Sequence, residues 1–144
     1  MDLKQLYQDI ILEHGKNPRN FGKCENHTNE ARGHNPLCGD HISIQIIMEG
    51  DNVADAQFTG SGCAISTASA SILTETIKGK SRKEIELLFG NFHNLVTGNE
   101  AEKDLGKLSI FGGVQKYPAR VKCATLSWHA LMAAIEGKKE TSTE

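Results

Sequence analysis

The stretch from Ile42 to Thr59 constrains the fold most, because it predicts two adjacent β-strands. Apolar and polar residues alternate on both sides of Gly50-Asp51-Asn52, the pattern of half-buried strands. The apolar positions are Ile42, Ile44, Ile46 and Met48 in the first strand, and Ala54, Ala56 and Phe58 in the second. A short link between such strands predicts an antiparallel hairpin. Residues that precede the first strand should therefore lie beside residues that follow the second.

Three candidate ligand residues lie at the open end of this hairpin. Cys38 and Asp40 precede the first strand, two positions apart around Gly39. Residues i and i+2 of an extended segment point to the same side, and a glycine allows a tight turn, so both side chains can converge on one point. Cys63 follows the returning strand. We therefore expect Cys63 to reach the same end of the sheet.

Cys63 also stands at the start of a predicted helix over residues 64–78. Free N–H groups and the helix dipole favour an anion at this position and lower the pKa of a thiol. Gly60 and Gly62 suit the close approach of a neighbouring group. The alternative is a small core residue behind the hairpin, but these neighbours favour a metal ligand.

Cys123 lies in a final helix that is predicted to begin at Pro118 and to end at Gly137. At 100° per residue it falls beside the core stripe, in a strip with Arg120 that we expect to be partly exposed. The cations Arg120 and Lys122 favour its thiolate. We predict a zinc site of three thiolates and one carboxylate, formed by Cys38, Asp40, Cys63 and Cys123.

Other cysteine and histidine residues are predicted to lie outside this ligand set. Cys24 has polar neighbours and is interpreted as a spare surface thiol. We expect His27, His34 and His41 to be solvated or hydrogen-bonded. His34 and His41 are close enough in sequence to Cys38 to remain reserve candidates.

The rest of the chain predicts helices and connecting segments. A first helix covers residues 2–14 and ends at Gly15, and a short edge strand is possible over 28–33. Ser81-Arg82-Lys83-Glu84 is a capping box that starts a helix with core residues Ile85, Leu88, Phe89 and Phe92. Residues 94–113 are rich in glycine, with one short helix near 100–105. This segment either covers the flank of the site or is plain connecting structure.

The composition predicts one soluble globular domain. The chain has 144 residues, 38% hydrophobic and 24% charged, and we assign residues 1–137 to a single zinc-binding domain and 138–144 to a polar, frayed tail. A net charge of −2 predicts no general affinity for nucleic acid or an anionic membrane. Without a recognisable signal peptide or membrane span, we expect a cytoplasmic protein. Its four cysteines are then more readily metal ligands or reactive thiols than disulfides.

Several motifs, in order, give the chain a specific resemblance. They are Leu-Tyr-Gln-Asp-Ile-Ile-Leu-Glu-His near the start, Asn17-Pro18-Arg19-Asn20, Asn35-Pro36-Leu37-Cys38-Gly39-Asp40, Gly60-Ser61-Gly62-Cys63-Ala64-Ile65-Ser66 and Arg120-Val121-Lys122-Cys123-Ala124. With these motifs the chain resembles the U-type (IscU/NifU-like) iron–sulfur cluster assembly family. The resemblance implies an α+β fold, with a small three-stranded antiparallel sheet packed against several helices.

Within that family the chain is most similar to the SufU branch. The scaffold branch has a histidine immediately before its third cysteine, where this chain has Lys122. The scaffold branch also has a shorter path between its second and third cysteines, a path that residues 94–113 lengthen in this chain. The resemblance implies a zinc-dependent sulfurtransferase that works with a SufS-like cysteine desulfurase, a pyridoxal-phosphate enzyme, and with downstream iron–sulfur assembly proteins. A histidine of the desulfurase would take a zinc position and free Cys38 to accept the persulfide sulfur. Arg120 could hold Asp40 or the departing thiolate.

Two alternatives stay open at this point. The ligand set could instead carry a [2Fe–2S] cluster, in which case the protein is an assembly scaffold. Lys122 argues against this, because a cation replaces a potential ligand. A structural zinc module that only binds a partner is the other alternative, although structural sites favour four cysteine or histidine ligands.

Overall fold

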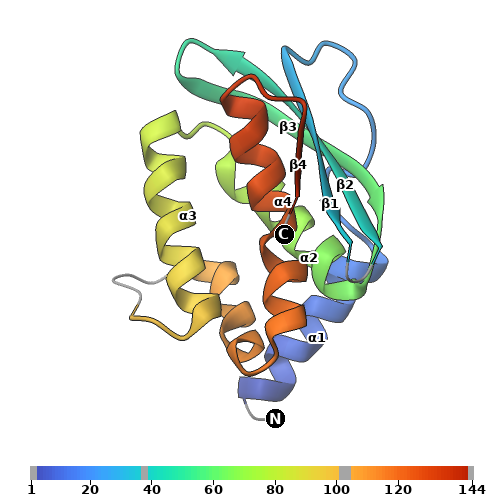
Figure 1. Ribbon diagram of the computed structural model, residues 1–144, viewed down its shortest axis with the longest axis vertical. Helices are drawn as coiled ribbons and strands as arrows, with labels where there is room; N and C mark the ends of the chain where they lie inside the picture. Colours follow the sequence, from blue (N-terminus) through green and yellow to red (C-terminus); the bar gives the residue numbers. More distant parts are fainter. Residues whose placement is uncertain (1–2, 37–38, 101–104, 143–144) are drawn as a thin grey trace.

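A four-stranded sheet forms one side of the molecule, and the helices gather on one face of it (Figure 1). The structure is a computed structural model that describes residues 3–36, 39–100 and 105–142. The elements in chain order are α1 (Leu3–Lys16), β1 (Asn29–Asn35), β2 (Asp40–Glu49), β3 (Asn52–Ser61), α2 (Ala64–Ile77), α3 (Arg82–Thr97), the 3-10 helix η1 (Gly106–Lys116), α4 (Pro118–Ile135) and β4 (Glu140–Ser142). None of the helices in the described ranges is long and apolar enough to cross a membrane.

The sheet has the order β3-β2-β1-β4 and is mixed, so the expectation of three antiparallel strands is wrong. β1 and β3 pair with β2 in antiparallel fashion, whereas β4 runs parallel to β1. The predicted edge strand over 28–33 is β1, and it lies inside the sheet. The tail is not frayed over residues 140–142, because α4 returns the chain beside the open edge of β1, whose backbone groups need partners.

The predicted hairpin is confirmed as β2 and β3, with one irregularity. Ile42, Ile44 and Ile46 face the core as expected. Near the turn, Ile47 pairs with Asp55 and Met48 pairs with Val53, so Ala54 is an extra residue in a bulge. The alternation had assigned a buried position to Ala54. Ala54 is exposed instead, and Val53 takes the buried position.

Helices α2 and α4 lie close together because their facing residues are small or hydroxylic. Ser69 is buried on α2, and its Oγ donates a hydrogen bond of 2.6 Å to the Ala124 carbonyl of α4. The Ala- and Ser-rich first half of α2 thus lies directly against the backbone of α4. On the other side of α4, Trp128 stacks on Phe89 and Phe92 of α3, at centroid distances of 5.6 and 5.2 Å. The α4 helix is thus held on both flanks.

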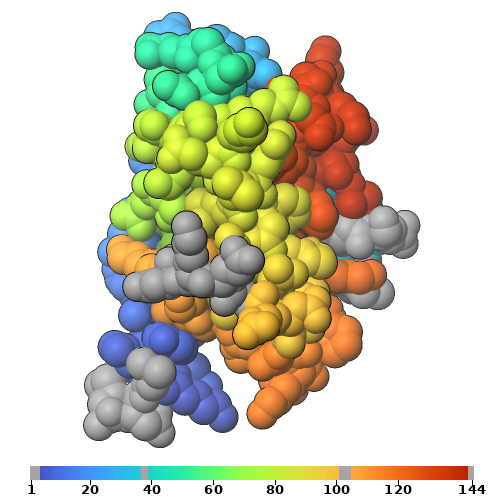
Figure 2. All heavy atoms as spheres, turned by 90° about the vertical axis from the view of Figure 1, so that its left-hand side faces the viewer, coloured from blue at the N-terminus to red at the C-terminus, as the bar shows by residue number. Residues whose placement is uncertain are grey.

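Helix α3 begins at the predicted capping box, with both of its hydrogen bonds present, and forms much of the face seen in Figure 2. It ends at Gly98, which is left-handed. The segment that follows contributes to the core, because Leu108 and Phe111 of η1 are fully buried. The short helix expected near 100–105 falls mostly on residues 101–104, outside the described residues.

Helix α1 packs on α2 and ends at Lys16, two residues beyond the predicted end. Gly15 stays helical, and its missing side chain lets the helix approach Ala64 closely. His14 is buried with 2% exposure, and its Nδ1 lies 2.7 Å from Ser71 Oγ. Ser71 Oγ also accepts a 2.8 Å hydrogen bond from the Arg19 N–H, so His14 belongs to a buried hydrogen-bonded cluster that links α1, the loop after it and α2.

The free energy of unfolding should fall between about pH 7 and about pH 5, partly because of His14. Burial, followed by the charge of Arg19, lowers the pKa of His14 below its ordinary value of 6.5. The unfolded chain therefore takes up a proton near that value while the folded chain does not, and stability is lost as the pH falls. Urea unfolding at both pH values should show a smaller loss for His14→Gln than for the wild type.

The matched control is His27→Gln, at an exposed histidine, which should keep the full pH dependence. Equal pH dependence in His14→Gln and the wild type would contradict the burial argument.

Candidate metal centre

Asp40 is the anchor of the candidate metal centre. It is the first residue of β2, pairs with Asn35 of β1, and is only 2% exposed. Its Oδ1 accepts a 3.0 Å hydrogen bond from the Cys63 N–H, and its Oδ2 accepts one of 2.9 Å from Ser66 Oγ. Both donors belong to the start of α2, where the helix dipole favours an anion. The carboxylate is thus held in one orientation.

Two glycines make this geometry possible. Gly39 adopts a left-handed φ of +71° immediately before Asp40. A Cβ on Gly62 would lie 2.6 Å from Asp40 Oδ1, so a larger residue there would displace the carboxylate. The sequence predicted a close approach at Gly62, and the group that approaches is the carboxylate of Asp40.

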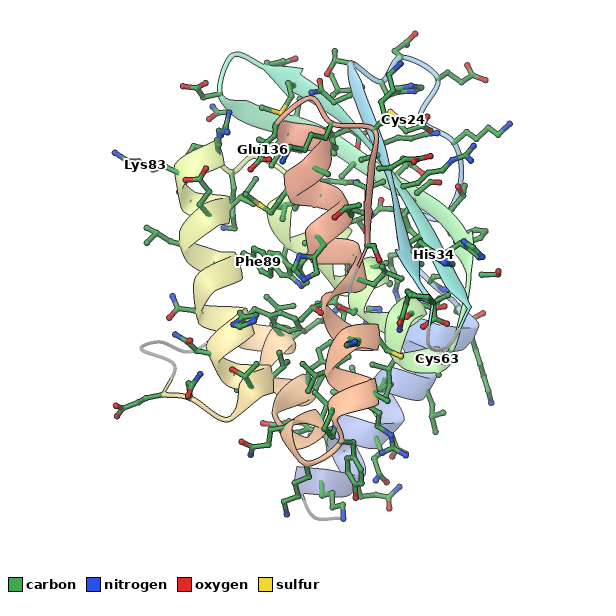
Figure 3. All side chains as sticks on the ribbon, in the orientation of Figure 1. Cys24, His34, Cys63, Lys83, Phe89 and Glu136 are labelled. Atoms are coloured by element: carbon green, nitrogen blue, oxygen red, sulfur yellow. The ribbon has the colours of Figure 1, made fainter. Side chains whose placement is uncertain are left out.

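Cys63 occupies the N-cap position of α2, as predicted. Its Sγ accepts a 3.5 Å hydrogen bond from the Ser66 N–H and lies 4.0 Å from Asp40 Oδ2. The residue is exposed, and Figure 3 shows it below His34, at the end of the sheet where α2 begins. A ligand at Cys63 can therefore be reached from solvent.

Cys123 comes from the first half of α4 and is buried, with 3% exposure, although the helical wheel predicted partial exposure. The reason is tertiary. α4 lies between β1 and α2, so the flank beside its core stripe is covered as well. Asn35 Nδ2 donates a hydrogen bond to Cys123 Sγ at 3.7 Å, and a sulfur that is ionised or bound to a metal can accept such a bond.

The Asp40, Cys63 and Cys123 side chains meet at one point. Their ligand atoms all lie within 4.8 Å of one another. Two sulfurs on one tetrahedral zinc ion, at about 2.3 Å each, are roughly 3.8 Å apart, so small side-chain rotations suffice to share an ion. Two sulfurs and one carboxylate oxygen fit the donor preferences of zinc. Cys38, the fourth predicted ligand, lies outside the described residues.

The two thiols of this group influence each other strongly. A hydrogen bond with Cys123, followed by hydrogen bonds from the backbone N–H and the side chain of Ser66, lowers the pKa of Cys63. The same contact with Cys63, together with burial, raises the pKa of Cys123. Without an ion, this contact favours the thiolate on Cys63 and the thiol on Cys123. A cation would replace the proton of that thiol, since a metal holds both thiols ionised.

Comparison with known proteins gives this arrangement a family. Residues 6–137 match the model of the NifU-like N terminal domain. The chain belongs to this family. It is 45% identical to the zinc-dependent sulfurtransferase SufU of Bacillus subtilis, over 93% of this chain and 92% of that protein. It is 40% identical to the iron–sulfur cluster assembly scaffold protein IscU of Streptococcus pyogenes, over 93% of this chain and 85% of that one.

A solved structure supports the same assignment. The crystal structure of a proposed iron–sulfur cluster assembly scaffold protein of the SUF system from Fervidobacterium islandicum superposes with a TM-score of 0.85 at 34% identity, over 93% of this chain and 99% of that chain. The α+β architecture of this NifU-like domain, with helices on a small sheet, is therefore confirmed. Relatives named as a sulfurtransferase and as scaffolds are similarly close, so family membership does not choose between the two activities.

The structure also locates the other residues that the sequence singled out in this NifU-like domain. The guanidinium of Arg120 lies over the Tyr117 ring, 4.4 Å from its centroid, and its role at Asp40 stays a prediction. Cys24 is not a surface thiol. It is 7% exposed because the loop before β1 folds over Gln45, whose Oε1 accepts the Cys24 N–H. Figure 3 shows Cys24 far from Cys63.

Sequence reasoning missed Asn35 and Ser66 as members of the site. Both are fully buried, and each donates a hydrogen bond to a candidate ligand. A signal was present for Ser66, which stands three residues after Cys63, the spacing at which an N3 side chain meets the N-cap. Asn35 directs its side chain to α4, a helix distant in sequence, so no local pattern identifies its partner.

Replacing Ser66 with alanine should weaken metal binding by about 10- to 100-fold, the usual effect of losing a hydrogen bond to a ligating group. The hydroxyl orients Asp40 Oδ2 and also lies 3.2 Å from the Cys123 carbonyl. Zinc affinity can be measured by competition with a chelating dye. The unfolding free energy should fall as well, by about 1–3 kcal/mol, because a buried acceptor loses its donor.

Ser69→Ala is the matched control for this prediction. Ser69 is also buried on α2, but it donates to the Ala124 carbonyl and not to a candidate ligand. This variant should lose stability and retain zinc affinity. Equal zinc affinity in both variants would show that Ser66 does not position Asp40.

Proposed function

We propose that this protein is a zinc-dependent sulfurtransferase of iron–sulfur cluster assembly, which accepts sulfur from a cysteine desulfurase on Cys38. The observation that carries the proposal is the meeting of Asp40, Cys63 and Cys123 within 4.8 Å. Sequence similarity to SufU of B. subtilis, which is named a zinc-dependent sulfurtransferase, supports this function. The site would hold zinc through these three residues, with Cys38 as the fourth ligand.

The donor set suits an exchangeable zinc site. Bound zinc would keep the thiols ionised near neutral pH, so no general base is needed to generate a nucleophile. One of the ligands is a carboxylate, whereas closed structural sites use cysteine and histidine. The exposure of Cys63 leaves the site accessible to a partner protein. Ser66 and the Cys63 N–H hold Asp40 in place while other ligands change.

The proposed transfer is a thiol–disulfide type of exchange. The Cys38 thiolate attacks the terminal sulfur of a persulfide on the desulfurase. A bond forms between Cys38 Sγ and that sulfur, and the sulfur–sulfur bond of the desulfurase breaks. The desulfurase cysteine leaves as a thiolate, so electrons balance without an added oxidant or reductant. A SufS-like pyridoxal-phosphate enzyme is the proposed donor, and downstream assembly proteins in the cytoplasm are the proposed acceptors.

A scaffold for a [2Fe–2S] cluster is the second candidate. Sequence similarity to IscU of S. pyogenes, which is named a scaffold protein, favours this second function. Cysteine thiolates can hold iron as well as zinc. We place it second because Lys122 stands immediately before Cys123 and offers no ligand to an iron ion.

Desulfurase turnover with and without this protein tests the proposal. We expect sulfide release from cysteine to rise severalfold when the zinc-loaded protein is added, and to return to the basal rate when zinc is removed. The protein as isolated should contain about one zinc ion per chain and be colourless, because zinc has a filled d shell. Stoichiometric iron with visible absorption after anaerobic purification would favour the scaffold instead.

A further inference from the structure

The outer face of the sheet carries a pair of histidines that the candidate metal centre does not use. His34 of β1 and His41 of β2 stand directly opposite each other in the ladder. Their rings are stacked, with centroids 4.7 Å apart and 25° between the planes, and their Nδ1 atoms are separated by 3.2 Å. Both side chains are exposed to solvent.

The distance between the two Nδ1 atoms fits two ligands of one ion. At about 2.0–2.1 Å from a metal, two nitrogens are roughly 2.9 Å apart for a right angle and 3.3 Å for a tetrahedral one. The observed 3.2 Å lies within this interval. A neutral imidazole has a lone pair on one of its two ring nitrogens, so each ring can offer an Nδ1 lone pair to an ion. Because the rings are nearly parallel, their in-plane Nδ1 lone pairs do not converge in the stacked arrangement, and both exposed side chains would rotate out of the stack to share an ion.

The surroundings leave room for the rest of a coordination shell. The pair lines a groove of about 520 Å³ together with Arg32, Ser43, Glu140 and Thr141. Arg32 of β1 pairs with Glu140 of β4, so these two charged residues that line the groove have opposite signs. Water can thus supply further oxygen ligands, and the groove carries no net positive charge to oppose a cation.

We propose that His34 and His41 form a second metal site, which takes a borderline divalent transition ion such as Ni²⁺ or Zn²⁺. Imidazole nitrogen is the ligand such ions share. The site lies on the opposite face of the sheet from the first centre, because the next pair between β1 and β2, Asn35 and Asp40, faces inward. This proposal does not rest on the sulfurtransferase activity.

Calorimetric titration of Ni²⁺ into zinc-loaded protein tests the site, with the first centre already filled. We expect one saturable Ni²⁺ site per chain, and at least a tenfold loss of affinity in His34→Ala and in His41→Ala. His93→Ala, at an exposed histidine of α3, is the matched control and should bind as the wild type does. All three histidines are exposed, so the variants should fold.

Side-chain NMR of the wild type gives a second readout that does not depend on variants. Paramagnetic Ni²⁺ should broaden the imidazole signals of His34 and His41 before those of the other histidines. The proposal is overturned if no saturable binding occurs, if His34→Ala and His93→Ala bind equally, or if the broadening begins elsewhere. It is also overturned if Ni²⁺ binds only by displacing zinc from the first centre.

Discussion

Replacing Cys123 or Cys63 with serine should abolish stoichiometric zinc binding and lower the melting temperature by roughly 5–10 °C. A serine hydroxyl does not ionise near neutral pH, so each variant loses a ligand from the group that meets within 4.8 Å. Zinc at 100 times its dissociation constant stabilises the folded state by about 2.7 kcal/mol. In a domain of about 150 residues, 1 kcal/mol corresponds to about 2–4 °C.

Metal analysis and thermal melts with and without a strong chelator measure both effects. In the wild type the chelator should lower the melting temperature, and in Cys63→Ser and Cys123→Ser it should have no further effect. Cys24→Ser is the control, because this thiol is also buried but lies away from the site. It should keep its zinc even if its own burial costs stability. Unchanged melting in the Cys63 and Cys123 variants would place the metal elsewhere.

The second large effect is expected at Cys38, where alanine should abolish sulfur acceptance. Incubation of the wild type with desulfurase and cysteine, without reductant, should leave one extra sulfur on Cys38. In Cys38→Ala this sulfur should be absent, and stimulation of the desulfurase should be lost. The variant should still bind the desulfurase, since one missing ligand does not remove a docking surface. Mass mapping after a single turnover locates the sulfur.

Each outcome of that mapping has a distinct meaning. Sulfur on Cys63 or Cys123 would retain the transfer function and replace the nucleophile. Sulfur on Cys24 would contradict transfer at the metal centre, and no sulfur anywhere would favour the scaffold. Asp40→Ala is the informative companion, because it should loosen zinc while leaving Cys38 in place. That variant should also be less stable, since the Cys63 N–H and Ser66 lose their acceptor.

The hairpin of β2 and β3 was predictable because its information is local. Alternation assigned the buried face of Ile42, Ile44 and Ile46, and the short turn set the direction of the return. From that topology alone Cys63 had to approach Asp40, and the structure brings the Cys63 N–H to 3.0 Å from the carboxylate. The bulge at Ala54 was not predictable, because alternation carries no sign of an extra residue.

Features that depend on distant partners were not accessible in the same way. The pairing of residues 140–142 with β1 requires the path of α4 beside the sheet, and a three-residue polar strand has no pattern of its own. Burial of Cys24 and Cys123 likewise depends on a loop and on neighbouring elements that cover them. A helical wheel assumes that one side of a helix is buried, whereas α4 is covered by other elements on several sides.

Residue order identifies the available chemistry, namely which thiols and which carboxylate precede or begin the elements of the fold. These follow from residue type and local periodicity. Three features instead depend on the packed fold: Asn35 and Ser66 donate to the candidate ligands, Cys123 is buried, and His34 stacks on His41 across the sheet. The reason is that each of these contacts joins residues whose relative positions are set by packing and strand register, which no local pattern records.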